Sequence, residues 1–130
     1  MLSLESWLDQ FELDGEIRAR AAEVLGALPG EVLLDFLHDP AFVICDYEPG
    51  PGKSFLVPMR LGVKRPGRAV VLKRTLRSRP EDFARWVIAH ELAHAHLRNG
   101  GRFEGDDPEV AADALAATWG FPKPRRLPWQ

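Results

Sequence analysis

The chain has 130 residues, of which 45% are hydrophobic and 28% charged, and its formal net charge at pH 7 is −2. These values are ordinary for a globular protein and predict one domain, residues 1–130, with a modest core. No stretch approaches the roughly 20 apolar residues that a membrane-spanning helix needs, and the chain begins without the basic and apolar regions of a signal peptide. With Cys45 as the single cysteine, no intramolecular disulfide can form. We therefore expect a cytoplasmic protein without a membrane partner.

Apolar residues at helical spacing predict a helical N-terminal part, residues 1–40. A short helix is expected around Trp7, a second from near Asp14 to Leu28, and a third between Pro29-Gly30 and Asp39-Pro40.

The middle of the chain has the composition of β-strands. The runs 41–47, 54–59 and 68–73 are separated by segments rich in proline and glycine, which predict hairpin connections in a three-stranded sheet. Pro58 indicates that its strand lies at an edge or ends there. The last strand could pair with the backbone of an extended substrate.

Two further helices are predicted in the C-terminal half. One runs from about Arg79 to Arg98, with Ser78-Arg79-Pro80-Glu81 as a capping box and Asn99-Gly100-Gly101 as its end. Its apolar residues form two stripes, so it should be buried on two sides. The other helix starts at Asp107-Pro108-Glu109 and runs to Gly120. Residues 123–130 should form an extended tail, in which Trp129 either docks on the domain or binds something else.

The first of these helices carries His90-Glu91-Leu92-Ala93-His94, an HExxH motif. Histidines at i and i+4 lie one turn apart on one helix face, so both imidazoles can bind one metal ion while Glu91 reaches it from the side. Both histidines lie on an apolar stripe and should be shielded from bulk water. Two imidazoles, a third protein ligand and a water form a typical catalytic zinc site, in which Glu91 is the expected general base.

The third ligand has several candidates. His96 lies about 140° around the helix from the histidine pair and should be a surface or packing residue. Glu109 and Asp113 are one turn apart on a face with Ala112 and Ala116, which allows close helix packing. Glu109 could then bind the metal while Asp113 accepts a hydrogen bond from a ligating histidine. Alternatively, Glu109 is an acid placed at a helix N-terminus, and the ligand comes from the preceding loop, which offers Glu104, Asp106 and Asp107.

HExxH followed by a helix with Glu-x-x-x-Asp resembles the gluzincin metallopeptidases. The segment from Glu109 to Pro122, EVAADALAATWGFP, looks like the corresponding segment of the bacterial ImmA/IrrE proteins. The resemblance covers roughly residues 68–122. It implies a small zincin-like α+β fold, Zn²⁺ held by His90, His94 and Glu109, Glu91 as the base, Asp113 as a supporting residue, and a bacterial regulatory protein as the substrate.

Three hypotheses remain for the function. The first is a zinc-dependent peptidase acting on a peptide or protein, for which Tyr47 and His38 are weak candidates to stabilise the oxyanion. The second is a catalytically silent metal-binding interaction domain, which the intact Glu91 disfavours. The third is a nucleic-acid-associated protein that uses the basic stretch 60–79, which contains eight Lys and Arg residues and no acid. Residues 1–50 hold eleven acids and two arginines, so a solvated face neutralised by the acidic half is the more ordinary explanation.

Overall fold

Three helices form the N-terminal part of the protein, as the apolar spacing predicts. The computed structural model describes residues 3–48, 67–98 and 108–129. Within them, α1 is Leu4–Leu8, α2 is Gly15–Gly26 and α3 is Gly30–Leu37. The Asp14 side chain caps α2 by accepting from the backbone N–H groups of its first turn, and Pro29 stands at the N-cap of α3.

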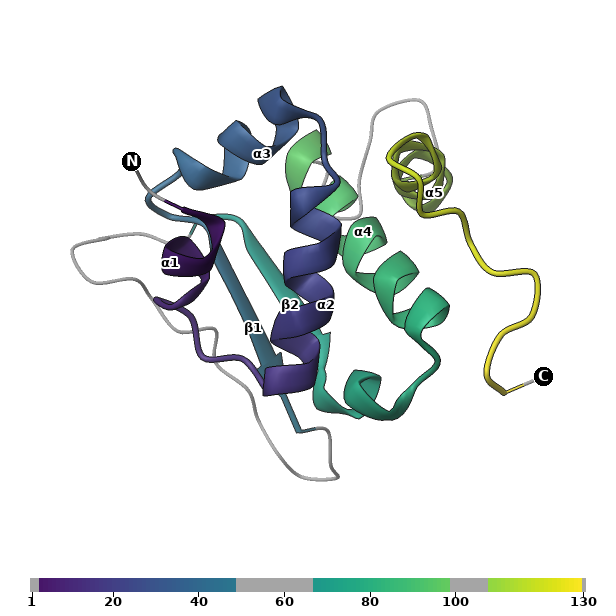
Figure 1. The fold of residues 1–130 in the computed structure, drawn as a ribbon. Coiled ribbons are helices and arrows are strands. Elements are labelled where there is room, and N and C mark those ends of the chain that lie inside the picture. Colours follow the sequence, from purple (N-terminus) through teal and green to yellow (C-terminus); the bar gives the residue numbers. More distant parts are fainter. Residues whose placement is uncertain (1–2, 49–66, 99–107, 130) are drawn as a thin grey trace.

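Two parallel strands form a small sheet behind α2 (Figure 1). Strand β1 is Val43–Tyr47 and β2 is Ala69–Lys73, with Val43 paired to Ala69 and Tyr47 to Lys73. Gly67 precedes β2 and lies so close to Ala41 that a β-carbon would overlap the backbone carbonyl of Ala41. The absence of a side chain therefore lets the chain enter β2 beside the start of β1.

The arrangement of the sheet corrects the sequence-based expectation. A sheet made from consecutive hairpins would place residues 54–59 between the first and the last strand, whereas β1 and β2 pair directly. The predicted strand 54–59, including Pro58, lies outside the described residues. Alternation of residue types indicates strands but not their neighbours, which is why the hairpin order was wrong. The described chain is thus a mixed α+β structure, mostly helical, with a two-stranded parallel sheet.

Helix α4 spans Glu81–Leu97 and follows a short 3₁₀ helix, η1, at Arg74–Ser78. The predicted capping box is wrong, because Pro80 is the N-cap and the Ser78 hydroxyl donates to the Thr75 carbonyl within η1. The Ser78 side chain is therefore engaged within η1 and does not cap α4. At the other end α4 stops at Leu97, one residue before the predicted end, and its C-cap Arg98 adopts the left-handed conformation with φ of 54°. The predicted stop signal, Asn99-Gly100-Gly101, lies outside the described residues.

Helix α5 spans Pro108–Thr118 and ends two residues before the predicted end at Gly120. Gly120 has a φ of 99°, and the Phe121 N–H donates to the Ala116 carbonyl across 3.0 Å, a glycine-dependent helix termination. Asp107, its predicted cap, lies outside the described residues. Residues 121–129 contain no helix or strand. Trp129 remains 67% exposed while its ring makes an edge contact with Phe83.

The core lies between the sheet and helices α2 and α4. Helix α2 packs on α4, α4 also contacts β2, and α5 packs on α4 (Figure 1). Helix α4 is buried on two sides as predicted, with Ile88 and Leu92 completely inaccessible. Cys45 is buried in β1, where burial and the neighbouring Asp46 raise the pKa of its thiol to about 11, consistent with a packing role. None of the described helices combines the length and the apolar character needed to cross a membrane.

Candidate metal centre

Helix α4 brings two histidines to one point. His90 and His94 lie one turn apart, and their Nε2 atoms are 3.1 Å from each other. His90 is buried and His94 partly buried, so both imidazoles are largely shielded from bulk water. The predicted position of the pair on an inward-facing stripe is confirmed.

Glu109, in the first turn of α5, completes a group of three residues that we call the metal group: His90, His94 and Glu109. Its carboxylate oxygens lie 2.8 Å from His90 Nε2 and 3.0 Å from His94 Nε2. Ala112 and Ala116 are fully buried at the contact between α5 and α4, and their small side chains permit this approach. The acids of the preceding loop that were alternative ligands, Glu104, Asp106 and Asp107, lie outside the described residues.

Asp113 contacts the ring nitrogen of His90 that faces away from His94 and Glu109. Its Oδ1 atom lies 2.8 Å from His90 Nδ1, as the one-turn spacing from Glu109 predicted. The same oxygen accepts a hydrogen bond of 3.1 Å from the indole N–H of Trp86. In the sequence, Trp86 is one of the apolar residues of this helix and carries no sign of a polar role. Its spacing of four residues before His90 is compatible with this role but does not reveal it, because Asp113 belongs to another helix.

The chemistry of the donor atoms fits a metal ion. If neutral His90 donates from Nδ1 to Asp113, its Nε2 carries a lone pair directed at a carboxylate oxygen and a second imidazole nitrogen. Such atoms repel one another unless protons or a cation lie among them. A tetrahedral zinc ion with bonds of about 2.1 Å separates its ligands by about 3.4 Å, which is slightly more than the distances of 2.8–3.1 Å observed here. A movement of a few tenths of an ångström would accommodate the ion.

Glu91 shares a cavity with the metal group. A cavity of about 580 Å³ is lined by Glu91, His94 and Glu109 at one end and extends along the last turn of α4 to Arg98. Burial raises the pKa of the Glu91 carboxyl, the neighbouring His90 and His94 oppose the rise, and Glu109 adds to it. A carboxylate with a raised pKa is better suited to exchange protons near neutral pH.

The weaker candidate residues lie elsewhere. Tyr47 is at the end of β1, and His38 is the C-cap of α3. Neither belongs to the lining of the cavity, although His38 lines an adjoining depression that shares Arg68 and Arg98 with it. His96 lies outside the metal group as predicted, and its Nδ1 is 2.8 Å from Asp35.

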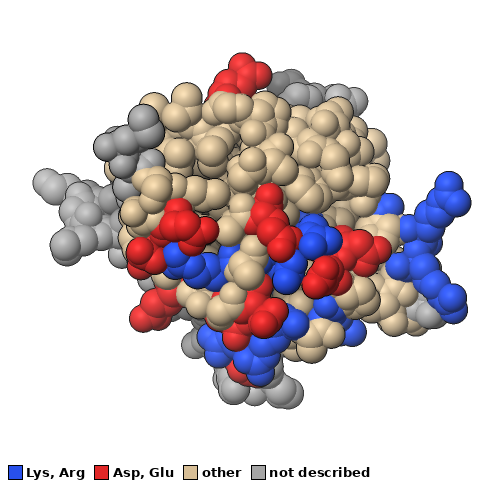
Figure 2. Space-filling view, viewed as in Figure 1, with Lys and Arg blue, Asp and Glu red and all other residues tan. Residues whose placement is uncertain are grey.

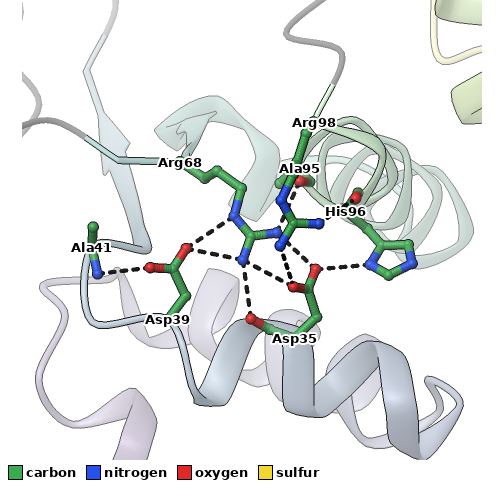
Figure 3. A network of polar contacts seen from close by, with 7 residues as sticks. All are labelled: Asp35, Asp39, Ala41, Arg68, Ala95, His96 and Arg98. Carbon is green, nitrogen blue, oxygen red and sulfur yellow. Dashed lines mark hydrogen bonds and ion pairs between the residues drawn. The ribbon is translucent and has the colours of Figure 1, made fainter.

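A second polar cluster, which we call the arginine network, lies at the C-terminal end of α4 (Figure 3). It comprises Asp35, Asp39, Arg68, His96 and Arg98. Asp35 on α3 accepts hydrogen bonds from both arginines, with Arg68 Nη1 at 2.7 Å and Arg98 Nη2 at 2.6 Å. Burial alone would raise the pKa of Asp35, but hydrogen bonds from Arg68, His96 and Arg98 lower it well below its ordinary range. The network joins α3, the start of β2 and the end of α4.

The described arginines of the basic stretch are largely paired with acids of the N-terminal half. Arg68 bridges Asp35 and Asp39, while Arg74 contacts Asp46 at 3.0 Å. Arg77 lies 3.4 Å from Asp14. Acidic and basic side chains also alternate on the face that carries α2 (Figure 2). Within the described part of the chain, three arginines of the basic stretch are thus paired with acids of the N-terminal half.

Comparison of the chain with protein-family models, with curated proteins and with solved structures found no match. The case for a functional site therefore depends on the geometry and chemistry of the residues themselves.

Proposed function

We propose that this protein is a zinc-dependent peptidase of the gluzincin type. The observation that carries the proposal is the convergence of His90 Nε2, His94 Nε2 and the Glu109 carboxylate, next to a cavity that also contains Glu91. Two imidazoles and one carboxylate form a common catalytic zinc set. The HExxH segment and the following Glu-x-x-x-Asp helix support the zincin-like fold and the resemblance to ImmA/IrrE proteins.

Each residue of the site has a distinct task. Zinc in such a site lowers the pKa of the water it binds to about 7 and so supplies a nucleophile near neutral pH. Glu91 accepts a proton from the attacking water and later donates it to the leaving amine. Asp113 accepts the Nδ1 proton of His90 and thereby keeps the Nε2 lone pair directed at the metal group.

The paired arginines make the alternative of nucleic-acid binding less favoured, because acids already engage Arg68, Arg74 and Arg77 of the basic stretch. The substrate we propose is accordingly a peptide or a protein in the cytoplasm, by resemblance a bacterial regulatory protein. Strand β2, which pairs with β1 among the described residues, is the proposed support for an extended substrate backbone.

The proposal is tested by replacing Glu91 with glutamine. Glutamine preserves size but cannot accept the proton, so Glu91→Gln should retain one zinc per chain while cleavage slows by ~10²- to 10⁴-fold. Metal content is measured by elemental analysis, and cleavage by mass spectrometry of a diverse peptide pool. Glu16→Gln, the same change at an exposed position on α2, is the control and should leave both values unchanged.

Three outcomes would contradict parts of the proposal. Equal cleavage by Glu91→Gln and the parent would remove Glu91 from catalysis. Stoichiometric metal without cleavage of any peptide would favour a metal-binding interaction domain. A parent protein that binds no zinc would overturn the proposal altogether.

A further inference from the structure

The two ends of the cavity beside the metal group differ in charge. Its acidic side chains, Glu91 and Glu109, lie at the end where His94 is located. The other end is formed by the start of β2 and the last turn of α4, and contributes Arg68 and Arg98. A peptide that enters the cavity therefore meets carboxylates near the metal group and guanidinium groups farther along α4.

The two arginines are not equivalent. Arg68 is 15% exposed and is held by Asp35 and Asp39, and it also donates to the Ala95 carbonyl at 3.0 Å. Its hydrogen-bonding capacity is largely used within the protein. Arg98 is 59% exposed. Its described contacts engage Nη2 with Asp35 and Nη1 with the His96 carbonyl, so part of its five-donor guanidinium remains available to a ligand.

The backbone of Arg98 supports a role beyond helix termination. Arg98 is the one non-glycine residue with positive φ among the described residues. The left-handed conformation is unfavourable for a residue that carries a side chain, and glycine is the usual residue where a helix ends in this way. Here the conformation places an arginine at the cavity, where Asp35 fixes one edge of its guanidinium group (Figure 3).

We propose that Arg98 forms an anion-binding subsite that receives a carboxylate of the substrate peptide. This inference rests on the proposed peptidase function. His94 lies in the last turn of α4 and Arg98 is the C-cap four residues later, about 6 Å farther along the helix axis. An extended peptide advances about 3.3 Å per residue. The recognised carboxylate, an acidic side chain or a chain terminus, therefore lies one or two residues from the bond that is cleaved.

The subsite is tested by binding, independently of turnover. The probes are two pools of octapeptides with blocked termini and neutral randomised positions, one pool with Glu and the other with Gln at a fixed position. Each pool is passed over immobilised Glu91→Gln protein, with and without zinc, and bound peptides are quantified by mass spectrometry. We expect the Glu pool to bind roughly 3- to 10-fold better, as a partly exposed, charge-assisted contact allows.

Substitution of Arg98 assigns the preference to this residue. Adding Arg98→Gln to the Glu91→Gln protein should equalise the two pools, whereas Arg125→Gln, the same charge change in the exposed tail, should leave the preference intact. Arg98→Lys retains the charge without the planar guanidinium and should keep a reduced preference. Thermal unfolding establishes that each variant is folded. If Arg98→Gln does not fold, the salt dependence of binding to the Glu91→Gln protein is measured instead. A preference for the Glu pool that disappears when NaCl is raised from 50 to 500 mM supports an ionic subsite. A preference that persists at 500 mM NaCl contradicts it.

A second set of peptides distinguishes a side chain from a chain terminus. Octapeptides with a free C-terminal carboxylate and no internal acid are compared with their amidated forms on the same protein. Preference for the free acid that Arg98→Gln abolishes identifies a chain terminus as the ligand, and preference confined to internal Glu identifies a side chain. Equal binding in both comparisons would overturn the subsite.

The result can be separated from the fate of the peptidase proposal. If no variant hydrolyses peptides but the Glu preference depends on Arg98, the subsite stands and the peptidase assignment fails. If the parent hydrolyses peptides with no preference for acids, or with one that Arg98→Gln leaves unchanged, the subsite is wrong and the peptidase assignment stands.

Discussion

Helix α4 contributes to two polar clusters that satisfy their charged and polar groups in opposite ways. The metal group joins two imidazoles and a carboxylate, with Asp113 behind His90, so its members chiefly offer electron pairs. The arginine network instead sets two guanidinium groups against two carboxylates. Its formal charges cancel when His96 is neutral.

This difference separates a binding site from a structural connection. A cluster dominated by electron-pair donors becomes favourable when a cation joins it, whereas a cluster with balanced charges is already satisfied by its own members. Substitutions in the metal group should therefore change metal binding more than folding. Substitutions in the core of the arginine network should change folding more than metal binding.

The largest expected effect comes from removing one metal ligand. His94→Ala should abolish stoichiometric zinc binding, since two remaining protein ligands seldom hold zinc firmly. His96→Ala, the same substitution two residues farther along α4, should retain one zinc per chain. Elemental analysis after dialysis against metal-free buffer measures both, and circular dichroism verifies the helical content.

The zinc content of His94→Ala and His96→Ala decides whether the metal group and the arginine network are separate units. One zinc per chain in His94→Ala would mean that the metal group is not the binding site. Loss of zinc in both variants would show that the two clusters cannot be treated as separate units.

The sequence predicted well those features that depend on local spacing. All five predicted helices are present, because their apolar residues recur with the helical period and proline or glycine marks their ends. The convergence of His90 and His94 follows from the i, i+4 geometry alone. Glu109 was predicted as one candidate for the third ligand, because the alanines on its helix face indicated close packing against another helix.

Features that depend on distant pairing could not be predicted. The parallel pairing of β1 with β2 joins residues more than twenty positions apart, and no local pattern specifies it. The contact of Arg68 with Asp35 and the hydrogen bond from Trp86 to Asp113 likewise connect separate elements. The sequence showed an acidic half and a basic stretch, but only the fold determines which charges meet.

The second prediction concerns the arginine network. Asp35→Asn removes the carboxylate that Arg68 and Arg98 share and leaves the Arg68 guanidinium, 15% exposed, with Asp39 as its remaining carboxylate partner. We expect the free energy of unfolding to fall by about 2–4 kcal/mol, while zinc stoichiometry stays at the parental value. Urea denaturation of the zinc-free proteins measures the loss. Glu31→Gln, an exposed acid on the same helix, is the control and should change stability little.

This contribution should depend on pH in one direction. Burial tends to raise the pKa of Asp35 in the folded protein, but the hydrogen bonds from the arginines and His96 outweigh this effect and lower the pKa. Its stabilisation is therefore fully present above the unfolded-state value of about 4 and declines as pH falls through the lower, folded-state value. The stability difference between the parent and Asp35→Asn should shrink as pH is lowered below about 4. A difference that grew on acidification would contradict this assignment.

The smallest expected effect is a change in zinc affinity caused by substituting Trp86, which contacts Asp113 and the ring of His90. Trp86 donates to the same Asp113 oxygen that faces His90 Nδ1, so Trp86→Phe removes one hydrogen bond while keeping an aromatic ring in place. Loss of Asp113 itself, in Asp113→Ala, should weaken zinc binding by ~10- to 100-fold. Trp86→Phe removes only one of the hydrogen bonds that orient Asp113 and should weaken zinc binding by roughly 2- to 5-fold. Competition with a chelating dye at fixed pH measures both affinities, and Trp129→Phe, in the exposed tail, should match the parent.

A double variant tests whether the two residues act in series. If the indole N–H serves only to orient Asp113, Trp86→Phe should have no further effect on zinc affinity once Asp113 has become alanine. Independent contributions would instead multiply, and the double variant would bind more weakly than Asp113→Ala by the full factor that Trp86→Phe causes alone. That result would place the influence of Trp86 in the packing of its ring against His90, whose centroid lies 5.7 Å away, rather than in the hydrogen bond.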